Sequence, residues 1–305
     1  MPNLSLTSRN KAILFTILAG VLWGTSFPVI KVGLTYTDPF AFLFWRFLVS
    51  SLTLLIAMGF LRRLEFKVQD KKLLFFLGIT NAIGYLLQYV AMNYTSAAKA
   101  ALFINLSAMW VALLSPKLLG ESFSKKKVVG VLFGLLGIVF VSTNLDFSTL
   151  GQGQLIADFM LICSGIVWAV FMIYNKKFVM RSTSATFQSM TWVLVLTLVT
   201  IVPFTVLAGS QFFELTISAW LAIFWTAIIC WVLPYYLWLE GLKHLSASTS
   251  TVLLLSEIVV AVILSIVTLR EPVTLFSTIG AFFIVVAIAL VSVNMNTRKV
   301  NAEKT

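Results

Sequence analysis

Long apolar stretches follow one another along almost the whole chain, and they constrain the fold more than any other feature. A hydrocarbon core about 30 Å thick takes roughly 20 apolar residues of α-helix to cross. We count ten such stretches, which lie near residues 12–34, 40–61, 73–92, 97–116, 127–143, 154–175, 185–207, 218–239, 247–269 and 274–294. Only 11% of the residues are charged and 60% are hydrophobic, whereas soluble domains carry about 25% charged residues. The sequence therefore predicts an all-α integral membrane protein of ten transmembrane helices.

The basic residues are distributed unevenly between the two ends of the predicted spans. With the N-terminus in the cytoplasm, most of the 22 lysines and arginines lie at the inner ends, and the outer side receives only Lys31, Lys99 and Arg270. This bias predicts a multi-pass protein of the cell membrane with both termini in the cytoplasm. The net charge of +11 does not indicate nucleic acid, because the basic residues are dispersed between apolar spans.

The two halves of the chain resemble each other. Residues 94–121 align without gaps on residues 244–271, and the same offset pairs Tyr85 with Tyr235. In the first span of each half, "WGTSFPVIK" and "WAVFMIYNK" share their tryptophan and lysine. We therefore expect two five-helix repeats, 12–143 and 154–294. Because five is odd, the second repeat enters the membrane from the opposite side, and such inverted repeats hold their substrate site between them near the midplane.

Glu257 is the strongest candidate for a functional residue. It lies about ten residues into the ninth span, which places it about 15 Å deep. A carboxylate at that depth is costly unless it is protonated, paired or in contact with water. One interpretation is coupling to protons or binding of a substrate ammonium group. The other is a protonated side chain that only bonds a neighbouring helix.

Further polar and aromatic residues are candidates for lining a cavity. Asn81, Tyr85 and Gln88 share one face of the third span by helical spacing. The full set of candidates is Trp23, Asn81, Tyr85, Gln88, Asn105, Trp168, Trp231, Tyr235, Trp238 and Glu257. The alternatives are packing or a lipid-interface belt for the aromatic residues and an interhelical hydrogen bond for Asn105.

Three basic residues lie within or at the ends of spans. Arg46 lies about seven residues into the second span. It either contacts a substrate anion or bonds a neighbouring helix. Lys31 and Lys176 end equivalent helices of the two halves, and we interpret them mainly as anchors at the membrane interface.

Several motifs resemble the drug/metabolite transporter superfamily, and within it the EamA-type ten-helix exporters, from about Ala12 to Asn294. The matching pieces are "LWGTSFPVIK", "DPFAFLFWRF", "YTSAAKAALF", "LLGE", "LSASTSTVLLLSE" and "LREPVT". The resemblance implies a central cavity, alternating access and export of amino acids or related metabolites. Ala108 and Ile258 stand where the family often has proline, and Arg270 replaces a small residue.

Other classes of function find less support in the sequence. There is no GxxxxGK[ST] loop for a nucleotide, and His244 is the single histidine. We therefore expect no cofactor, no metal and no catalytic residues. The expected partners are a small-molecule substrate and membrane lipids, without nucleic acid, and the oligomeric state stays open. The alternative functions are a membrane-embedded enzyme that acts on a lipid or lipid-linked substrate, and a channel.

Overall fold

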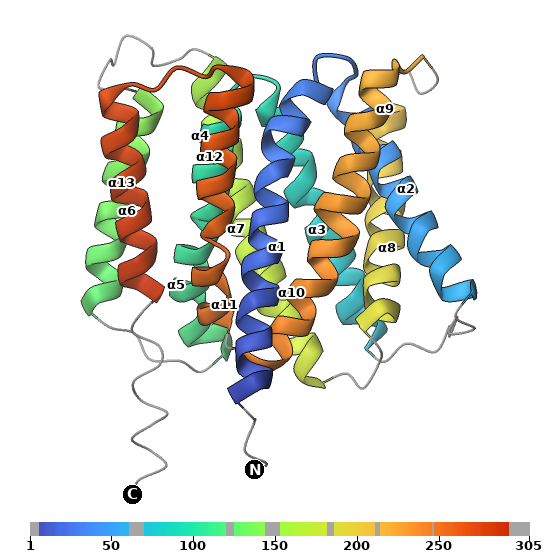
Figure 1. Ribbon diagram of the computed structural model, residues 1–305, viewed down its shortest axis with the longest axis horizontal. Helices are drawn as coiled ribbons and strands as arrows, with labels where there is room; N and C mark the ends of the chain where they lie inside the picture. Colours follow the sequence, from blue (N-terminus) through green and yellow to red (C-terminus); the bar gives the residue numbers. More distant parts are fainter. Residues whose placement is uncertain are drawn as a thin grey trace, which may run out of the picture.

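A computed structural model describes residues 6–60, 70–119, 125–143, 153–181, 186–210, 214–245 and 247–292. Within these ranges the chain is a bundle of roughly parallel and antiparallel helices without a strand (Figure 1). The helices are α1 (Leu6–Gly33), α2 (Pro39–Phe60), α3 (Lys71–Met92), α4 (Ala97–Asn105), α5 (Ser107–Leu119), α6 (Lys125–Thr143), α7 (Gly153–Arg181), α8 (Thr186–Leu207), α9 (Ile217–Phe224), η2 (Trp225–Val232), α10 (Leu233–His244), α11 (Ala247–Leu253), α12 (Ser256–Leu269) and α13 (Leu275–Ser292).

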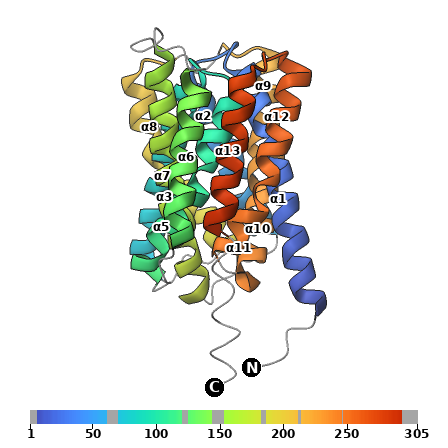
Figure 2. The ribbon, with the colours of Figure 1, turned by 90° about the vertical axis from the view of Figure 1, so that its left-hand side faces the viewer.

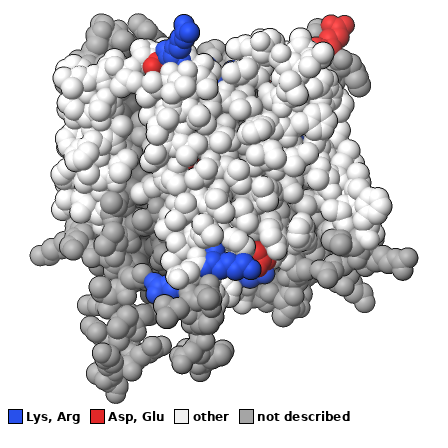
Figure 3. Space-filling model, in the orientation of Figure 1, with Lys and Arg blue, Asp and Glu red and all other residues white. Residues whose placement is uncertain are grey.

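The lengths and composition of these helices fit a membrane. Six helices of the described part are long and apolar enough to cross it: Ser8–Gly33, Pro39–Phe60, Lys71–Met92, Gln154–Met180, Thr186–Leu207 and Ile217–His244. Shorter apolar helices cover Ala97–Val111, Ser256–Leu269 and Leu275–Ala287. On the face drawn in Figure 3, the coloured charged side chains gather near the two ends and leave a wide uncharged belt between them. The expected helical, multi-pass class is confirmed, and the number ten stays a prediction.

Helices from the two halves of the chain are packed together. α1 packs against α10 and α12, and α7 packs against α3, α4 and α5. α2 lies beside α8 at one side of the bundle, while α6 and α13 lie side by side at the other in both views (Figures 1 and 2). No plane therefore separates the first half from the second.

The fourth and ninth apolar stretches are each interrupted, which the sequence analysis did not predict. α4 ends at Asn105 and α5 begins at Ser107, and α11 is separated from α12 by Leu254 and Leu255. At both interruptions the backbone makes tighter i to i−3 hydrogen bonds, from the Leu106 N–H to the Phe103 carbonyl (3.2 Å) and from the Glu257 N–H to the Leu254 carbonyl (2.9 Å).

A glycine of a neighbouring helix faces each interruption. A Cβ atom added to Gly20 of α1 would lie 3.2 Å from the Leu254 carbonyl oxygen. A Cβ atom added to Gly165 of α7 would lie 3.3 Å from the Ile104 carbonyl oxygen. Both positions leave no room for a larger side chain, so glycine permits α1 and α7 to approach the interrupted helices closely.

Lys31 and Lys176 do more than anchor helix ends. The Lys31 ammonium donates to the Met92 carbonyl at the end of α3 (2.7 Å). The Lys176 ammonium donates to the carbonyls of Leu242 (2.8 Å) and Leu245 (2.9 Å) at the end of α10. Each lysine thus satisfies carbonyl groups that have no partner within their own helix, and it places a positive charge at the negative end of the helix dipole.

We expect Lys31→Gln and Lys176→Gln each to lower the free energy of unfolding by about 1–2 kcal/mol, because each removes a charged hydrogen bond at a helix end. Unfolding in detergent micelles, followed by tryptophan fluorescence, measures the change. The matched control is Lys243→Gln, which removes an exposed pair with Glu240 and should cost about 0.5 kcal/mol or less. A loss at one lysine and none at the other would show that the two contacts are not equivalent.

η2 interrupts the long span from Ile217 to His244 with eight residues of π-helix. Pro234 lies two residues after its end, in the first turn of α10, and has no N–H to donate. A proline ring would clash with the carbonyl four residues earlier in a regular α-helix, and the wider π turns relieve that clash. Trp231 and Cys230, both buried, lie in this segment.

Candidate functional site

A cavity lies in the middle of the bundle, between helices of both halves of the chain. It is lined from the first half by Trp23, Ser26, Phe27, Tyr85, Gln88, Ile104, Asn105 and Ser107, and from the second half by Trp168, Phe171, Met172, Trp231, Trp238 and Glu257. Its volume is about 50 Å³. One buried water needs about 10–15 Å³ of such space, so the cavity has room for water.

The structure brings most of the predicted site residues together around this cavity. Eight of the candidates line it: Trp23, Tyr85, Gln88, Asn105, Trp168, Trp231, Trp238 and Glu257. Arg46 and Tyr235 do not line it but are buried against its wall, in contact with Tyr85 and Trp231 respectively, and Asn81 is buried without a printed contact to the lining. With the exception of Asn81, the predicted residues therefore form one cluster, with two members set behind its wall.

Among the described residues of the cavity wall, Glu257 is the one acid. It lies in the first turn of α12, next to the interruption, and Asn105 at the end of α4 lines the same cavity close enough to act on its carboxyl group. The Asn105 amide also donates to the Ala101 carbonyl (3.0 Å), which holds its side chain in place. The two interruptions thus bring Glu257 and Asn105 to the same cavity, and the lining contributed by the described part of the chain contains no lysine, arginine or histidine.

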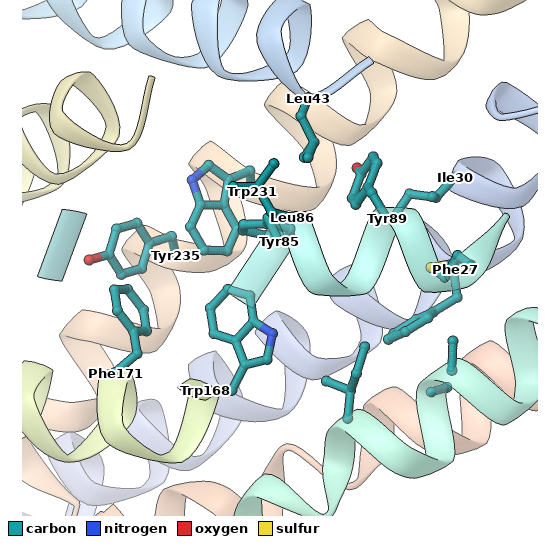
Figure 4. Packing of buried hydrophobic residues seen from close by; sticks show 14 of the residues in the cluster. Phe27, Ile30, Leu43, Tyr85, Leu86, Tyr89, Trp168, Phe171, Trp231 and Tyr235 are labelled. Carbon is teal, nitrogen blue, oxygen red and sulfur yellow. The ribbon is translucent and has the colours of Figure 1, made fainter. Parts of the chain in front are cut away.

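Aromatic residues make up much of the cavity wall that contains Glu257. The Tyr85 ring centroid lies 4.8 Å from that of Trp168 and 5.1 Å from that of Trp231. Trp23 lies 6.1 Å from Trp231 and 5.9 Å from Trp238, again between centroids. Figure 4 shows Tyr85, Trp168 and Trp231 converging from three different helices. Because these rings lie in contact with one another, a ligand that binds between them must move them apart.

Three of these tryptophans carry indole N–H groups without a partner. The Nε1 atoms of Trp23, Trp168 and Trp231 are buried and make no hydrogen bond with the described residues. A buried donor without an acceptor costs about 1–3 kcal/mol. The three tryptophans line the same cavity, so it is bordered by residues whose indole donors have no partner among the described residues.

Arg46 lies behind the aromatic wall, where it is 1% exposed. Its Nη1 atom donates to the Tyr89 hydroxyl, and its Nη2 atom donates to the Tyr85 hydroxyl at 3.2 Å. Its guanidinium carbon is 4.5 Å from the Tyr85 ring centroid and 5.7 Å from that of Trp231. The arginine bonds neighbouring side chains, and the rings of two cavity residues separate it from the cavity.

Asn81 and Tyr235 connect helices beside the cavity. The Asn81 amide donates to the Thr197 hydroxyl on α8 (2.9 Å). The Tyr235 hydroxyl donates to the Asn175 side-chain carbonyl on α7 (3.1 Å), and its ring stacks on Trp231 at 5.0 Å. Their place in the structure is to support the cavity wall.

Six residues of the lining were not singled out in the sequence: Ser26, Phe27, Ile104, Ser107, Phe171 and Met172. A signal for four of them was present. Ser26 and Phe27 follow Trp23 by three and four residues, and Phe171 and Met172 follow Trp168 in the same way, so each trio shares one helix face. Ile104 and Ser107 had no such signal in the sequence. They lie on either side of the helix interruption at Leu106, which the sequence did not predict.

Polar contacts join helices of the two halves at the end of the bundle opposite the start of α1. The Glu271 carboxylate, after α12, accepts from the N–H groups of Ala97 (2.6 Å) and Ala98 (3.0 Å) at the start of α4. The Lys99 ammonium pairs with the Asp158 carboxylate of α7 at 3.0 Å. These contacts hold that end of the bundle together in this conformation.

A bundle of apolar helices around a central cavity, with a carboxylate in its wall, is typical of a multi-pass membrane protein with an internal cavity. The model of the EamA-like transporter family matches residues 10–143 and 155–293. The chain belongs to this family of transporters.

Similar proteins agree with this membership. An uncharacterized transporter of Archaeoglobus fulgidus is 26% identical over 92% of this chain and 97% of its own length. The uncharacterized transporter YyaM of Bacillus subtilis is 25% identical over 93% of this chain and 94% of its own length. A crystal structure at 18% identity superposes with a TM-score of 0.68 over 95% of this chain and 99% of that chain, which shows the shared fold.

Proposed function

We propose that the chain is a secondary transporter that exports amino acids or related small metabolites by alternating access. The observation that carries the proposal is the central cavity, whose wall is built by both halves of the chain and contains one carboxylate at two helix interruptions. Interrupted helices at a repeat interface are where many secondary transporters bind substrate and coupling ions. In this proposal the cavity is the substrate site and Glu257 the coupling residue.

Matched contacts support two inverted repeats, about 12–143 and 154–294. Trp23, Ser26 and Phe27 line the cavity from α1, and Trp168, Phe171 and Met172 line it from α7 with the same spacing. The lysine caps on α3 and α10 and the glycines facing the two interruptions also occur in pairs. Each pair has one member in each half, as a two-fold axis in the membrane plane requires. We therefore propose ten spans related by this axis.

We propose a cell-membrane location with the start of α1 on the cytoplasmic side. Cysteine labelling tests the orientation at two exposed positions, Tyr94 after α3 and His244 at the end of α10. In intact cells, a membrane-impermeant maleimide should modify Tyr94→Cys and leave His244→Cys unmodified until the membrane is permeabilised. The unsubstituted protein, in which Cys230 is buried and Cys163 is half-buried within the span α7, is the control. Modification of both variants from the outside would contradict the proposed topology.

Counterflow in proteoliposomes tests the transport mechanism. Vesicles loaded with an unlabelled candidate from a panel of amino acids and metabolites should transiently accumulate the labelled compound, because an alternating-access carrier exchanges one for the other. Empty vesicles and protein-free vesicles are the controls. A channel would equilibrate the label without an overshoot, and a membrane-embedded enzyme would convert it chemically. Either result would contradict the proposed carrier mechanism.

A further inference from the structure

The connection between α3 and α4 is held by charged side chains from other parts of the chain. The Lys31 ammonium of α1 donates to the Met92 carbonyl before the connection (2.7 Å). The Glu271 carboxylate, which follows α12, accepts from the N–H groups of Ala97 (2.6 Å) and Ala98 (3.0 Å) after it. Lys31 and Glu271 also interact electrostatically with each other. A carboxylate at this position satisfies N–H groups that have no partner within α4, and the positive end of the helix dipole stabilises it.

α7 contributes a buried ion pair to the same connection. Asp158 of α7 is 2% exposed. Its carboxylate accepts from the Thr95 hydroxyl (3.2 Å) and pairs with the Lys99 ammonium of α4 (3.0 Å). Removal of one partner from such a pair leaves a buried charge without compensation, which is strongly unfavourable. The pair therefore stabilises the arrangement in which α4 and α7 are close together at this end of the bundle.

The turn after α12 places Glu271 at the start of α4. Arg270 ends the helix in the left-handed conformation (φ 52°), where glycine is the usual residue. The Glu271 N–H then bonds back to the Ser265 carbonyl (3.4 Å). Such a conformation persists where surrounding contacts hold it, so the turn and the bonds from Glu271 to α4 support each other.

The helices joined by these contacts also line the cavity. α1, α3, α4, α7 and α12 each contribute residues to its wall. Asn105 lies eight residues along α4 from Ala97, and Trp168 lies ten residues along α7 from Asp158, which corresponds to about 12 Å and about 15 Å. The cavity can therefore open toward this end only if the five helices separate where the charged contacts now join them.

We infer that Lys31, Lys99, Asp158 and Glu271 form a latch that closes the cavity toward this end of the bundle. The cavity opens there when Glu271 leaves the start of α4 and Asp158 separates from Lys99. Water can then hydrate the released charges and N–H groups, so the latch can break and form again in each cycle. The inference rests on the proposed function, since a latch has this role only in a carrier whose cavity opens to either side.

Access to a cavity cysteine tests the latch without a known substrate. The reporter is Ser26→Cys in a chain whose two native cysteines are replaced by alanine, because Ser26 lines the cavity and is 6% exposed. A membrane-impermeant maleimide is added to either face of the membrane, and labelling of Tyr94→Cys identifies the face on which the latch lies. With E271A or D158N added to the reporter chain, modification from the latch face should become at least about 5-fold faster, because charged hydrogen bonds made in the closed state are lost. Modification from the other face should not become faster.

The matched control is E240Q, which removes a carboxylate bonded to Thr186 and Lys243 near the end of α10. It should not speed modification from the latch face. If E271A yields no folded protein, E271Q and D158N decide the matter. E271Q keeps the size of the side chain and one acceptor oxygen, so it should give a smaller change in the same direction.

Two results would overturn the latch. The first is an unchanged rate from the latch face in folded E271A, or in folded E271Q where E271A does not fold, together with an unchanged rate in D158N. The second is an equal increase from both faces, which would mean that the variants loosen the whole bundle. Absence of counterflow in the unsubstituted protein would count against the proposed transport instead, since the labelling requires no substrate.

Discussion

Glu257→Gln should abolish gradient-driven accumulation of substrate and leave exchange in place. Accumulation requires a group that takes up and releases protons as the carrier cycles, whereas exchange requires only that the loaded carrier reorients. Glutamine keeps the size of the side chain and its place beside Asn105 but does not titrate. The measurement compares proteoliposome uptake under an imposed pH gradient with counterflow at saturating substrate and no gradient.

The matched control for this prediction is Glu240→Gln. Glu240 bonds Thr186 and Lys243 near the end of α10, away from the cavity. This variant should accumulate substrate as the unsubstituted protein does. If Glu257→Gln folds, accumulates substrate normally and keeps the same pH dependence, Glu257 has only a structural role and another group couples transport.

Gly24→Val should destabilise the bundle and stop transport together. α1 crosses α12 so closely at this glycine that an added Cβ atom would lie 2.6 Å from the Glu257 carbonyl oxygen and 2.8 Å from the Val260 Cβ atom. Neither neighbour is the end of a flexible side chain, so the two helices must separate. Overpacking of this kind costs about 1–3 kcal/mol, and the separation displaces Glu257 from the cavity wall. Unfolding in detergent and counterflow measure the two effects.

Leu18→Ala serves as the control for Gly24→Val, since Leu18 lies on the same helix with 40% of its surface exposed. It should leave both stability and transport close to those of the unsubstituted protein. Normal stability and transport in Gly24→Val would mean that α1 and α12 are not held in close contact in the membrane.

The helices could be predicted because their signal is local. Apolar stretches of membrane length end close to the observed helix ends, as between residues 73–92 and α3. The interruptions were missed because the residues at 106 and 254–255 are leucines, good helix formers. Packing of Gly165 and Gly20 against the backbone at these points has no local signal.

The candidate site was predictable where the two halves match. Trp23 and Trp168 were found through their common offset, and both line the cavity. The partners of Arg46 and Asn81 were not predictable. They lie on other helices, and apolar composition does not tell which helices of a bundle pack against each other. Both alternatives for Arg46 stayed open in the sequence, and the structure shows its tyrosine partners.

Access to the cavity from the two sides of the membrane tests alternating access most directly. Ser26 lines the cavity, is 6% exposed and lies on α1, so Ser26→Cys in a chain with Cys163 and Cys230 replaced by alanine reports on the site. Impermeant maleimides added to right-side-out or to inside-out vesicles should each react slowly with this cysteine. A transported substrate should change the two rates, as expected when one cavity opens to either side in turn. Reaction from one side only, at a rate that no transported substrate alters, would contradict the account.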